Sequence, residues 1–531
     1  MNTALTNKTL VCKSEYVTVR DSVRLAVSTW LPQDKINSIE KLPALLITTR
    51  YWRARAFQQD RPELQPSYPS AVYFRSQGYV LVIADARGSG ASFGSRETEM
   101  SPTEIEDIGE LIDWVAGQSW CDGRVATTGT SYTANTTLYS LVTAPTALKM
   151  GVCRAPDFDG YRHLLAPGGV VNHWFIDTWG KTTAAQDNND VKTLYKNGHW
   201  PLPAEDSDNL LGVRPVDTDI DGQLLTDAIT EHSDNFNLAG KEDRLTFVDS
   251  KPFGSYRYLF DSEYQAKIES SAIPMVIRCG WHDAGTQLGA LCMFASFNCS
   301  MRVILGPWNH GGDYRADPFQ AGDGNNPEAI PMEDVWSMTT GSLDIVFKPD
   351  GSEDSLDNQS NIIEYYTLGE NRWKSTGTWP LPNTSMRRLY FAENNQLLSQ
   401  EPLLEKGSDG YQVDPTAGTG LNNRWHTQMG SPVFFPDRQE ADKKLLVYDT
   451  PPLENDIEIT GHPVVHLWLR STATDGQFFV YLETIDPDGR VRLLTEGQLR
   501  GLHRKVSDET PPYLMFGSYH SLKERDAQPL I

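Results

Sequence analysis

Short apolar runs recur through the first third of the chain. Three of them are almost continuously apolar or β-branched: "LPALLITT" (42–49), "YVLVIAD" (79–85) and "RVATTG" (124–129). Runs of this length without polar alternation are typical of strands that are covered on both faces. The pattern therefore predicts strands buried inside a sheet.

The segment between the second and third runs, "SPTEIEDIGELIDWVAGQ" (101–118), has helical spacing. Its apolar positions share one face of a helix: Ile105, Ile108, Ile112 and Val115. Ser101 with Glu104 forms a capping box, and Pro102 takes the first helical position. Strand, helix and strand in this order predict a right-handed parallel crossover, so residues 1–155 begin an α/β sheet.

The strand pattern then stops and later returns. Residues 156–262 are dominated by Asp, Asn, Gly, Trp and Leu, and we expect an irregular helical insertion there. The sheet pattern resumes over 263–347, where "IPMVIRCG" (273–280) and "MRVILG" (301–306) flank the helix-like "TQLGALCMFASF" (286–297). We expect these two strands to join the sheet of the first segment.

An acidic, Ser/Asn-rich stretch, "KPDGSEDSLDNQSN" (348–361), is the expected linker to the last part of the chain. Residues 362–531 contain short strand-like runs divided by turns, among them "HPVVHLWLRSTA" (462–473). "DPDG" (486–489) is a turn signal between two alternating runs. This pattern of short strands and turns predicts a separate all-β domain, most simply a sandwich or jelly roll.

The charge balance limits the partners. The 531 residues include 47 basic and 70 acidic side chains, for a net charge of −23. This balance argues against nucleic acid and against anionic membrane surfaces, since both require patches of Lys and Arg. The N-terminus has no apolar core of signal-peptide length, and no run approaches the ~18 apolar residues of a membrane span. We therefore expect a cytoplasmic protein.

The six cysteines show no framework spacing, so free thiols are expected. A metal site built from Cys279, His282, Cys292 and Cys299 is the weaker alternative, because zinc ligands usually occur in tight pairs. We predict neither a metal nor a cofactor.

Candidate chemistry appears directly after the predicted strands. Ser131 follows "RVATT", Asp283 follows "MVIRCG" and His310 follows "RVILG". Reactive groups gather at the carboxyl ends of strands in open α/β sheets. The chain order Ser, Asp, His is also the order of α/β-hydrolases.

These residue types suit nucleophilic catalysis. The Ser131 hydroxyl needs a base to take its proton, and the His310 imidazole titrates near neutral pH. Asp283 would orient that imidazole, and the backbone N–H of Tyr132 would face a developing oxyanion. The turn departs from G-x-S-x-G, because Thr133 replaces the second glycine. A plain serine in a strand-to-helix turn, and His282 as the base, are the alternatives.

Several long motifs resemble the CocE/NonD hydrolases, a family that includes cocaine esterase, α-amino-acid ester hydrolases and, more distantly, X-Pro dipeptidyl peptidases. "ADARGSGASFGS" (84–95), "GTSY" (129–132), "GWHDAG" (280–285) and "GPWNHGG" (306–312) are similar to that family's loops, in the same order. "YVTVRDSVRLAVSTWLP" (16–32) is similar to its opening hairpin. The resemblance implies an α/β-hydrolase sheet with a helical cap and a C-terminal jelly roll.

The resemblance also implies roles for individual residues. It makes Ser131, Asp283 and His310 the triad and gives the second oxyanion donor to the Tyr51 hydroxyl. The cap would cover an acyl pocket with Trp174 and Trp179 in its lining. Further candidates for the rim of that pocket are Trp281, His282 and Trp308.

We therefore expect a serine hydrolase that cleaves small acyl esters or amides through an acyl-enzyme on Ser131. The same site could pass the acyl group to an amine or alcohol. An X-Pro dipeptidyl peptidase would need an acidic pocket for a free amine, and the insertion offers several candidates: Asp157, Asp159, Asp177, Asp187 and Asp190. A catalytically silent binding protein on the same fold is the alternative outside enzymology.

The sequence reaches its last residue where the resembling family continues for further sandwich strands. An incomplete sandwich exposes strand edges and apolar surface. We expect the end near Ile531 to be covered by a reshaped sheet or by another chain, either a second copy or a different protein.

Overall fold

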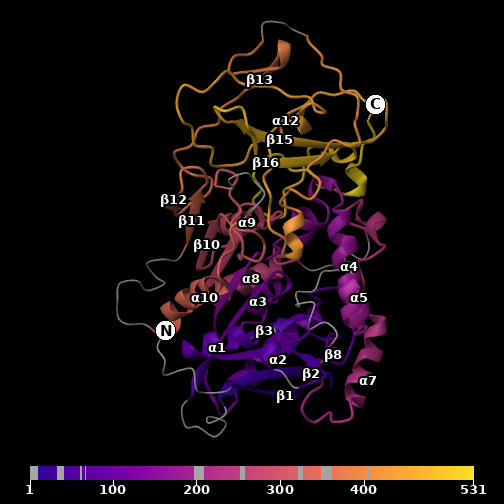
Figure 1. Ribbon diagram of the computed structural model, residues 1–531, viewed down its shortest axis with the longest axis vertical. Helices are drawn as coiled ribbons and strands as arrows, with labels where there is room; N and C mark the ends of the chain where they lie inside the picture. Colours follow the sequence, from indigo (N-terminus) through magenta and orange to yellow (C-terminus); the bar gives the residue numbers. More distant parts are fainter. Residues whose placement is uncertain are drawn as a thin grey trace.

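The computed structural model describes residues 10–32, 41–59, 62–65, 67–196, 209–250, 258–320, 327–348, 361–402 and 406–530. Ten strands form one sheet in the order β1-β2-β5-β3-β6-β7-β9-β10-β11-β12 (Figure 1). Its strands are β1 Leu10–Thr18, β2 Arg24–Pro32, β5 Val80–Asp85, β3 Leu42–Thr49, β6 Cys121–Thr130, β7 Leu148–Arg154, β9 Met275–Gly280, β10 Met301–Gly306, β11 Ile362–Thr367 and β12 Arg372–Thr376. The strands from β5 to β11 pair in parallel, and β1, β2 and β12 are antiparallel additions at the two edges.

Helices cover both faces of the sheet. One face packs against four helices: α2 Pro102–Ala116, α3 Tyr132–Thr143, α8 Ser262–Ser271 and α9 Thr286–Ser296. The other face packs against two: α1 Tyr68–Ser76 and α10 Met332–Phe347. The three predicted runs form β3, β5 and β6 and are buried along most of their length, which confirms the inference drawn from their unbroken apolar and β-branched residues. Strand β9 is buried throughout as well.

Helix α2 begins as its sequence predicts. The Ser101 side chain accepts a hydrogen bond from the Glu104 backbone N–H at 3.2 Å, and Pro102 opens the helix. The Glu104 carboxylate accepts instead from the backbone N–H of Met100, at 2.9 Å. The cap therefore closes one residue earlier than a standard capping box.

The boundary of the last domain differs from the predicted one. We placed residues from 362 onward in the C-terminal β domain, but β11 pairs in parallel with β10 and β12 folds back on β11, so both extend the central sheet. Helix α10 connects β10 to β11 as a further crossover. The acidic composition of 348–361 suggested a domain boundary, yet this crossover continues the sheet across it. Of that proposed linker, residues 349–360 lie outside the described residues.

The predicted insertion supplies the helices α4 His173–Asp187, α5 Val191–Lys196 and α7 Gln223–Glu231, which stand along one side of the sheet (Figure 1). A short strand in it, β8 Leu210–Val213, pairs with β4 Arg55–Phe57. The insertion is thus anchored to a loop that follows the first parallel strand.

The C-terminal region is a separate body with antiparallel strands, drawn in orange to yellow in Figure 1. Its hairpins are β13 Tyr390–Ala392 with β14 Gln396–Leu398, and β15 Gln477–Ile485 with β16 Val491–Arg500. The predicted turn at 486–489 lies in the second hairpin. Residues 462–473, which we expected to form a strand, are irregular, and Trp468 in that segment is 95 % exposed. Complete closure as a jelly roll stays a prediction.

The last described residues are bound by their own domain. The Leu530 backbone N–H donates to the Thr474 carbonyl at 2.7 Å, and the Leu530 side chain is buried. A partner chain over this region stays a prediction.

All six cysteines are free and buried. Within the described part of the chain, no group of three His, Cys, Asp or Glu side chains could hold a metal ion. No helix in the same part is both long enough and apolar enough to span a membrane.

Candidate active site

Ser131 occupies a sharp turn between β6 and α3. Its backbone has φ 61° and ψ −125°, a strained conformation for a residue with a side chain. Gly129 is required two residues earlier, since a Cβ there would come within 2.3 Å of the Thr133 hydroxyl. The turn therefore supports the predicted exposure of the Ser131 side chain at the carboxyl end of a buried strand.

Thr133 explains how the turn closes without a second glycine. Its hydroxyl donates to the Thr130 carbonyl at 2.8 Å and accepts from the Thr130 backbone N–H at 2.7 Å. The side chain thereby bridges the residues on both sides of Ser131. A threonine in this place makes two hydrogen bonds that a glycine could not.

Asp283 and His310 form a buried pair at the ends of β9 and β10. The Nδ1 of His310 donates to Asp283 Oδ1 at 2.8 Å. Asp283 has no exposed surface, and its other oxygen, Oδ2, accepts from the Thr286 hydroxyl at 2.8 Å. Burial alone would lower the pKa of His310, but the charge and hydrogen bond of Asp283 raise it above its ordinary value.

The opposite nitrogen of His310, Nε2, is buried and has no hydrogen-bond partner among the described residues. In particular, no hydrogen bond joins it to the Ser131 hydroxyl. Asn135 donates its backbone N–H to the Ser131 carbonyl at 2.9 Å and its side-chain amide to Asp157 at 3.2 Å. The negative charge of Asp157 helps to raise the pKa of His310. Because β6, β9 and β10 run in parallel in one sheet and each predicted triad residue follows the carboxyl end of its strand, all three lie on one rim of the sheet.

Two residues that the sequence did not suggest also hold Asp283. The Gln428 amide donates to Oδ1 at 2.6 Å, and the Thr427 hydroxyl approaches the same oxygen at 3.3 Å. Both come from the C-terminal region, in a single turn of 3₁₀ helix (His426–Met429). No motif marks them, because their role depends on how the C-terminal region packs against the sheet.

Tyr51 lies beside the Ser131 turn. Its ring packs edge-on against Tyr132, with ring centroids 5.8 Å apart, and its hydroxyl oxygen accepts a hydrogen bond from Trp179 Nε1 at 3.0 Å. Burial raises the pKa of Tyr51 to about 12, so the phenol keeps its proton at neutral pH. The bond from Trp179 leaves that proton available for another acceptor.

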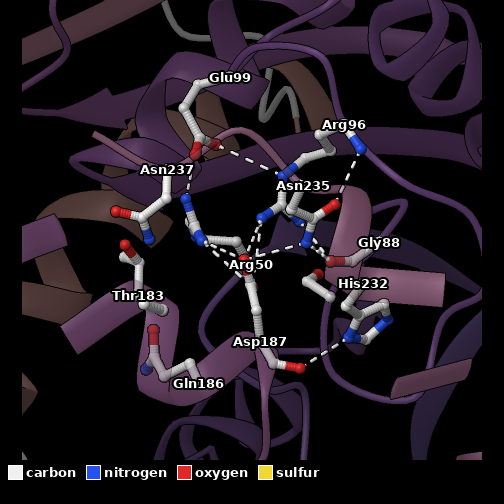
Figure 2. A network of polar contacts seen from close by, with 12 residues as sticks. Arg50, Gly88, Arg96, Glu99, Thr183, Gln186, Asp187, His232, Asn235 and Asn237 are labelled. Atoms are coloured by element: carbon white, nitrogen blue, oxygen red, sulfur yellow. Dashed lines mark hydrogen bonds and ion pairs between the residues drawn. The ribbon is translucent and has the colours of Figure 1, made fainter. Parts of the chain in front are cut away.

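A network of buried charges surrounds Arg50, the residue before Tyr51 in the chain (Figure 2). Two arginines converge on Asp187, the last residue of α4: Arg50 Nη2 lies 3.1 Å and Arg96 Nη2 lies 2.9 Å from Oδ2. Glu99 contacts the Arg50 guanidinium as well. Burial raises the pKa of Asp187, but the two arginines outweigh it and hold the pKa below its usual value.

This network attaches the cap to the rim of the sheet. Arg50 adjoins Tyr51 in the chain, and its guanidinium also lies over the Trp179 ring, with 5.0 Å between Cζ and the ring centroid. Because Asp187 and Trp179 belong to the same helix, the ion pairs fix the position of Trp179 relative to Tyr51.

The other proposed pocket residues are spread more widely. The Trp174 ring packs at a tilt of 50° against His426, with ring centroids 4.3 Å apart, and Trp281 Nε1 donates to the Tyr366 carbonyl at 2.8 Å. Trp308 lines a groove beside α10. Among these four tryptophans, Trp179 bonds a proposed catalytic group, the Tyr51 hydroxyl. For Trp174, Trp281 and Trp308 the pocket role stays a prediction.

His282 does not take the place of the base. Its ring packs against Phe435, and burial lowers its pKa to about 3, so it stays neutral. The Asp283 carboxylate bonds His310, which supports His310 as the base.

Two family models match the chain. The model described as X-Pro dipeptidyl-peptidase (S15 family) matches residues 21–312, and the model for the X-Pro dipeptidyl-peptidase C-terminal non-catalytic domain matches residues 355–529. The second match begins before β11, so it includes two strands that the structure places in the central sheet.

Similar proteins cover nearly the whole chain. A Mycobacterium bovis protein, provisionally named a serine esterase, is 36% identical over 550 residues, which cover 97% of this chain and 85% of that protein. The cocaine esterase of a Rhodococcus species is 24% identical over 523 residues, with 93% and 84% covered. A solved CocE/NonD family hydrolase from Staphylococcus aureus aligns with a TM-score of 0.63 at 16% identity, over 98% of this chain and 80% of that one, and this likeness concerns the fold alone.

Proposed function

The chain belongs to the S15 family, among the CocE/NonD-like serine hydrolases, and on this premise we propose that it cleaves small acyl esters or amides through an acyl-enzyme on Ser131. The observation that carries the proposal is the buried Asp283–His310 pair, whose free Nε2 lies on the same rim as the strained Ser131 turn.

The reaction begins when Ser131 attacks the substrate carbonyl and His310 Nε2 takes the hydroxyl proton. Asp283 stabilises the imidazolium that forms, and Thr286 and Gln428 keep that carboxylate in place. The oxyanion accepts hydrogen bonds from the Tyr132 backbone N–H and the Tyr51 hydroxyl. His310 then protonates the leaving group, and a water activated by the same imidazole releases the acid.

Trp179 assists this step through Tyr51. Its indole N–H occupies one acceptor site on the phenol oxygen, so the phenol proton can point at the oxyanion. Among the described residues no acceptor competes for that proton.

The test replaces the nucleophile. Ser131→Ala should lower kcat for p-nitrophenyl acetate by about 10⁴-fold or more and abolish labelling by a fluorophosphonate probe. Ser337→Ala, an exposed serine on α10, is the matched control and should retain both. Labelling that persists in Ser131→Ala would reject the assignment. Adding amine or alcohol acceptors to the same assay tests acyl transfer, which stays a prediction.

One observation favours substrates whose acyl part carries an amine, as an X-Pro dipeptide does. The negative charge of Asp157 contributes to the raised pKa of both His310 and Tyr51. Its Oδ1 is buried without a hydrogen-bond partner in the described residues. Burial raises its pKa to about 6, so it is mostly ionised at neutral pH. A substrate ammonium group would supply the missing partner.

This second candidate predicts a selective loss in Asp157→Asn. The variant should raise KM for an alanine p-nitrophenyl ester and for an X-Pro chromogenic dipeptide, while p-nitrophenyl acetate turnover changes little. An equal effect on charged and neutral substrates would reject an ammonium-binding role.

A further inference from the structure

A groove on the α10 face of the sheet is separate from the proposed catalytic residues. It has a volume of about 440 Å³ and lies between α10 and the strands β9 to β12. Arg278, Ile304 and Glu364 are register partners on neighbouring strands, so their side chains leave the same face of the sheet. Trp308 and Trp373 form an aromatic wall of the groove, with ring centroids 5.8 Å apart.

Arg278 brings a positive charge into this groove without a counter-charge. The side chain is 5 % exposed, and neither its Nε nor its Nη1 has an acceptor among the described residues. Nη2 contacts the Met338 sulfur, which is a weak acceptor. The guanidinium lies over the Trp308 ring, with Cζ 4.8 Å from its centroid.

The surroundings do not neutralise that charge. The register neighbour of Arg278 on β7 is Arg154, a second cation. Glu364, the acidic side chain of the groove, is paired with Arg302 at 2.7 Å. Burial and the neighbouring Arg154 lower the pKa of Arg278 to about 9, which still leaves it charged at neutral pH.

We propose that this groove binds a small aromatic carboxylate, with the carboxylate on Arg278 and the ring against Trp308 and Trp373. A guanidinium binds a carboxylate through two parallel hydrogen bonds. Among the residues that line the groove, Glu364 balances Arg302 and leaves the one positive charge of Arg278, which suits a monoanion. The volume is within the range of small-molecule sites. Met338 covers the guanidinium, and its unbranched side chain must turn aside for the anion to reach it.

Benzoate is a suitable probe, and benzamide is its neutral counterpart of the same shape. We expect benzoate to raise the Tm of the protein by about 1 °C at ten times its Kd, whereas benzamide leaves it unchanged. Calorimetric titration should give one saturable site. Water molecules that satisfy Arg278 would produce the opposite result, with no benzoate-specific shift at any concentration up to tens of millimolar.

Variants locate the site. Arg278→Met should weaken benzoate binding at least ten-fold, and Met338→Ala should leave it unchanged or tighter. Arg315→Met removes a partly exposed arginine paired with Glu328 and is the matched control, with unchanged binding. Equal binding to the wild type and to Arg278→Met would overturn the proposal, because benzoate would then occupy another site such as the catalytic one. Arg278→Gln provides the same test should the methionine variant fail to fold, and the benzoate-versus-benzamide comparison needs no variant.

Discussion

Two pairs of buried arginines in this protein have opposite surroundings. Arg50 and Arg96 share the Asp187 carboxylate, with Glu99 close to both (Figure 2). Arg154 and Arg278, neighbours on β7 and β9, have no ion pair within the described ranges, although Arg154 Nη1 donates to the Gly311 carbonyl at 3.5 Å. All four guanidinium groups belong to the same sheet or to the loops that follow its strands.

The difference separates two uses of a buried charge. The paired arginines connect the sheet to the last residue of α4 and thereby set the position of Trp179 over Tyr51. Arg154 donates to the Gly311 carbonyl, whereas two of the three guanidinium nitrogens of Arg278 have no acceptor among the described residues. A buried cation without a carboxylate partner is costly. We infer that the first pair supports the catalytic rim, whereas Arg278 is retained for an anion that comes from outside the chain.

The largest effect should follow from removal of the shared carboxylate. Asp187→Asn leaves two buried guanidinium groups without their main counter-charge, and we expect it to lower the free energy of unfolding by about 3–5 kcal/mol. Urea unfolding followed by tryptophan fluorescence measures the change. A loss below about 1 kcal/mol would mean that the ion pairs of Asp187 contribute little to stability. Arg50 and Arg96 would then not differ in this respect from Arg154 and Arg278.

The next experiment exchanges each kind of arginine for an apolar side chain of similar length. Arg50→Met should destabilise the protein, because it leaves Asp187 and Glu99 underpaired. Arg278→Met should be neutral or stabilising by about 1–4 kcal/mol, since it removes a buried charge that has no carboxylate partner in the described part of the chain. Unfolding midpoints of the two variants, measured side by side, should therefore move in different directions. Similar losses in both would show that Arg278 has an internal role.

A smaller effect tests whether the paired cluster serves the catalytic rim. Trp179→Phe removes the N–H that bonds Tyr51 and keeps an aromatic ring near Arg50. One hydrogen bond of about 1 kcal/mol corresponds to about a five-fold loss of kcat/KM, expected in kcat rather than in KM.

The loss of kcat/KM in Trp179→Phe should depend on the Tyr51 hydroxyl. In a Tyr51→Phe background, Trp179→Phe should cause no further loss, because the bond it removes no longer exists. Arg278→Met should keep the wild-type kcat/KM. Additive losses in the double variant would mean that Trp179 acts on the substrate directly.

Much of the fold was predictable because its signals are local. The unbroken runs of β3, β5 and β6 and the capped, periodic segment of α2 could each be recognised from their own residues. The place of β11 in the sheet could not be predicted from its own residues. It depends on pairing with β10, from which it is separated in the chain by α10 and a polar stretch. The irregular course of 462–473 likewise contradicts a strand-like apolar pattern.

The residues of the site also fall into two groups, those that the sequence could predict and those that it could not. Ser131, Asp283 and His310 follow strands and could be found from that position, and Asp283 with His310 does form a pair. Thr427 and Gln428 could not be found, because they reach Asp283 from a different domain. The unpaired state of Arg278 was also invisible, since only the packed sheet shows which carboxylates are within reach.

The smallest expected effect concerns how the free energy of unfolding depends on pH. We expect this dependence for the pair Arg50 and Arg96, which shares Asp187, and not for Arg154 and Arg278. The pKa of Asp187 is lower in the folded protein than in the unfolded chain, so the unfolded state binds more protons between those two values and stability rises with pH there. The contribution of Asp187 is complete above the unfolded pKa of about 3.9 and is lost as the pH falls through the folded value. The gap in unfolding free energy between the wild type and Asp187→Asn should therefore narrow as the pH falls below about 4. The gap between the wild type and Arg278→Met should stay constant over that window, because no carboxylate of the described residues is paired with Arg278. If the difference between the wild type and Arg278→Met also changed with pH, Arg278 would have an acidic partner. The two pairs of arginines would then both be neutralised within the protein.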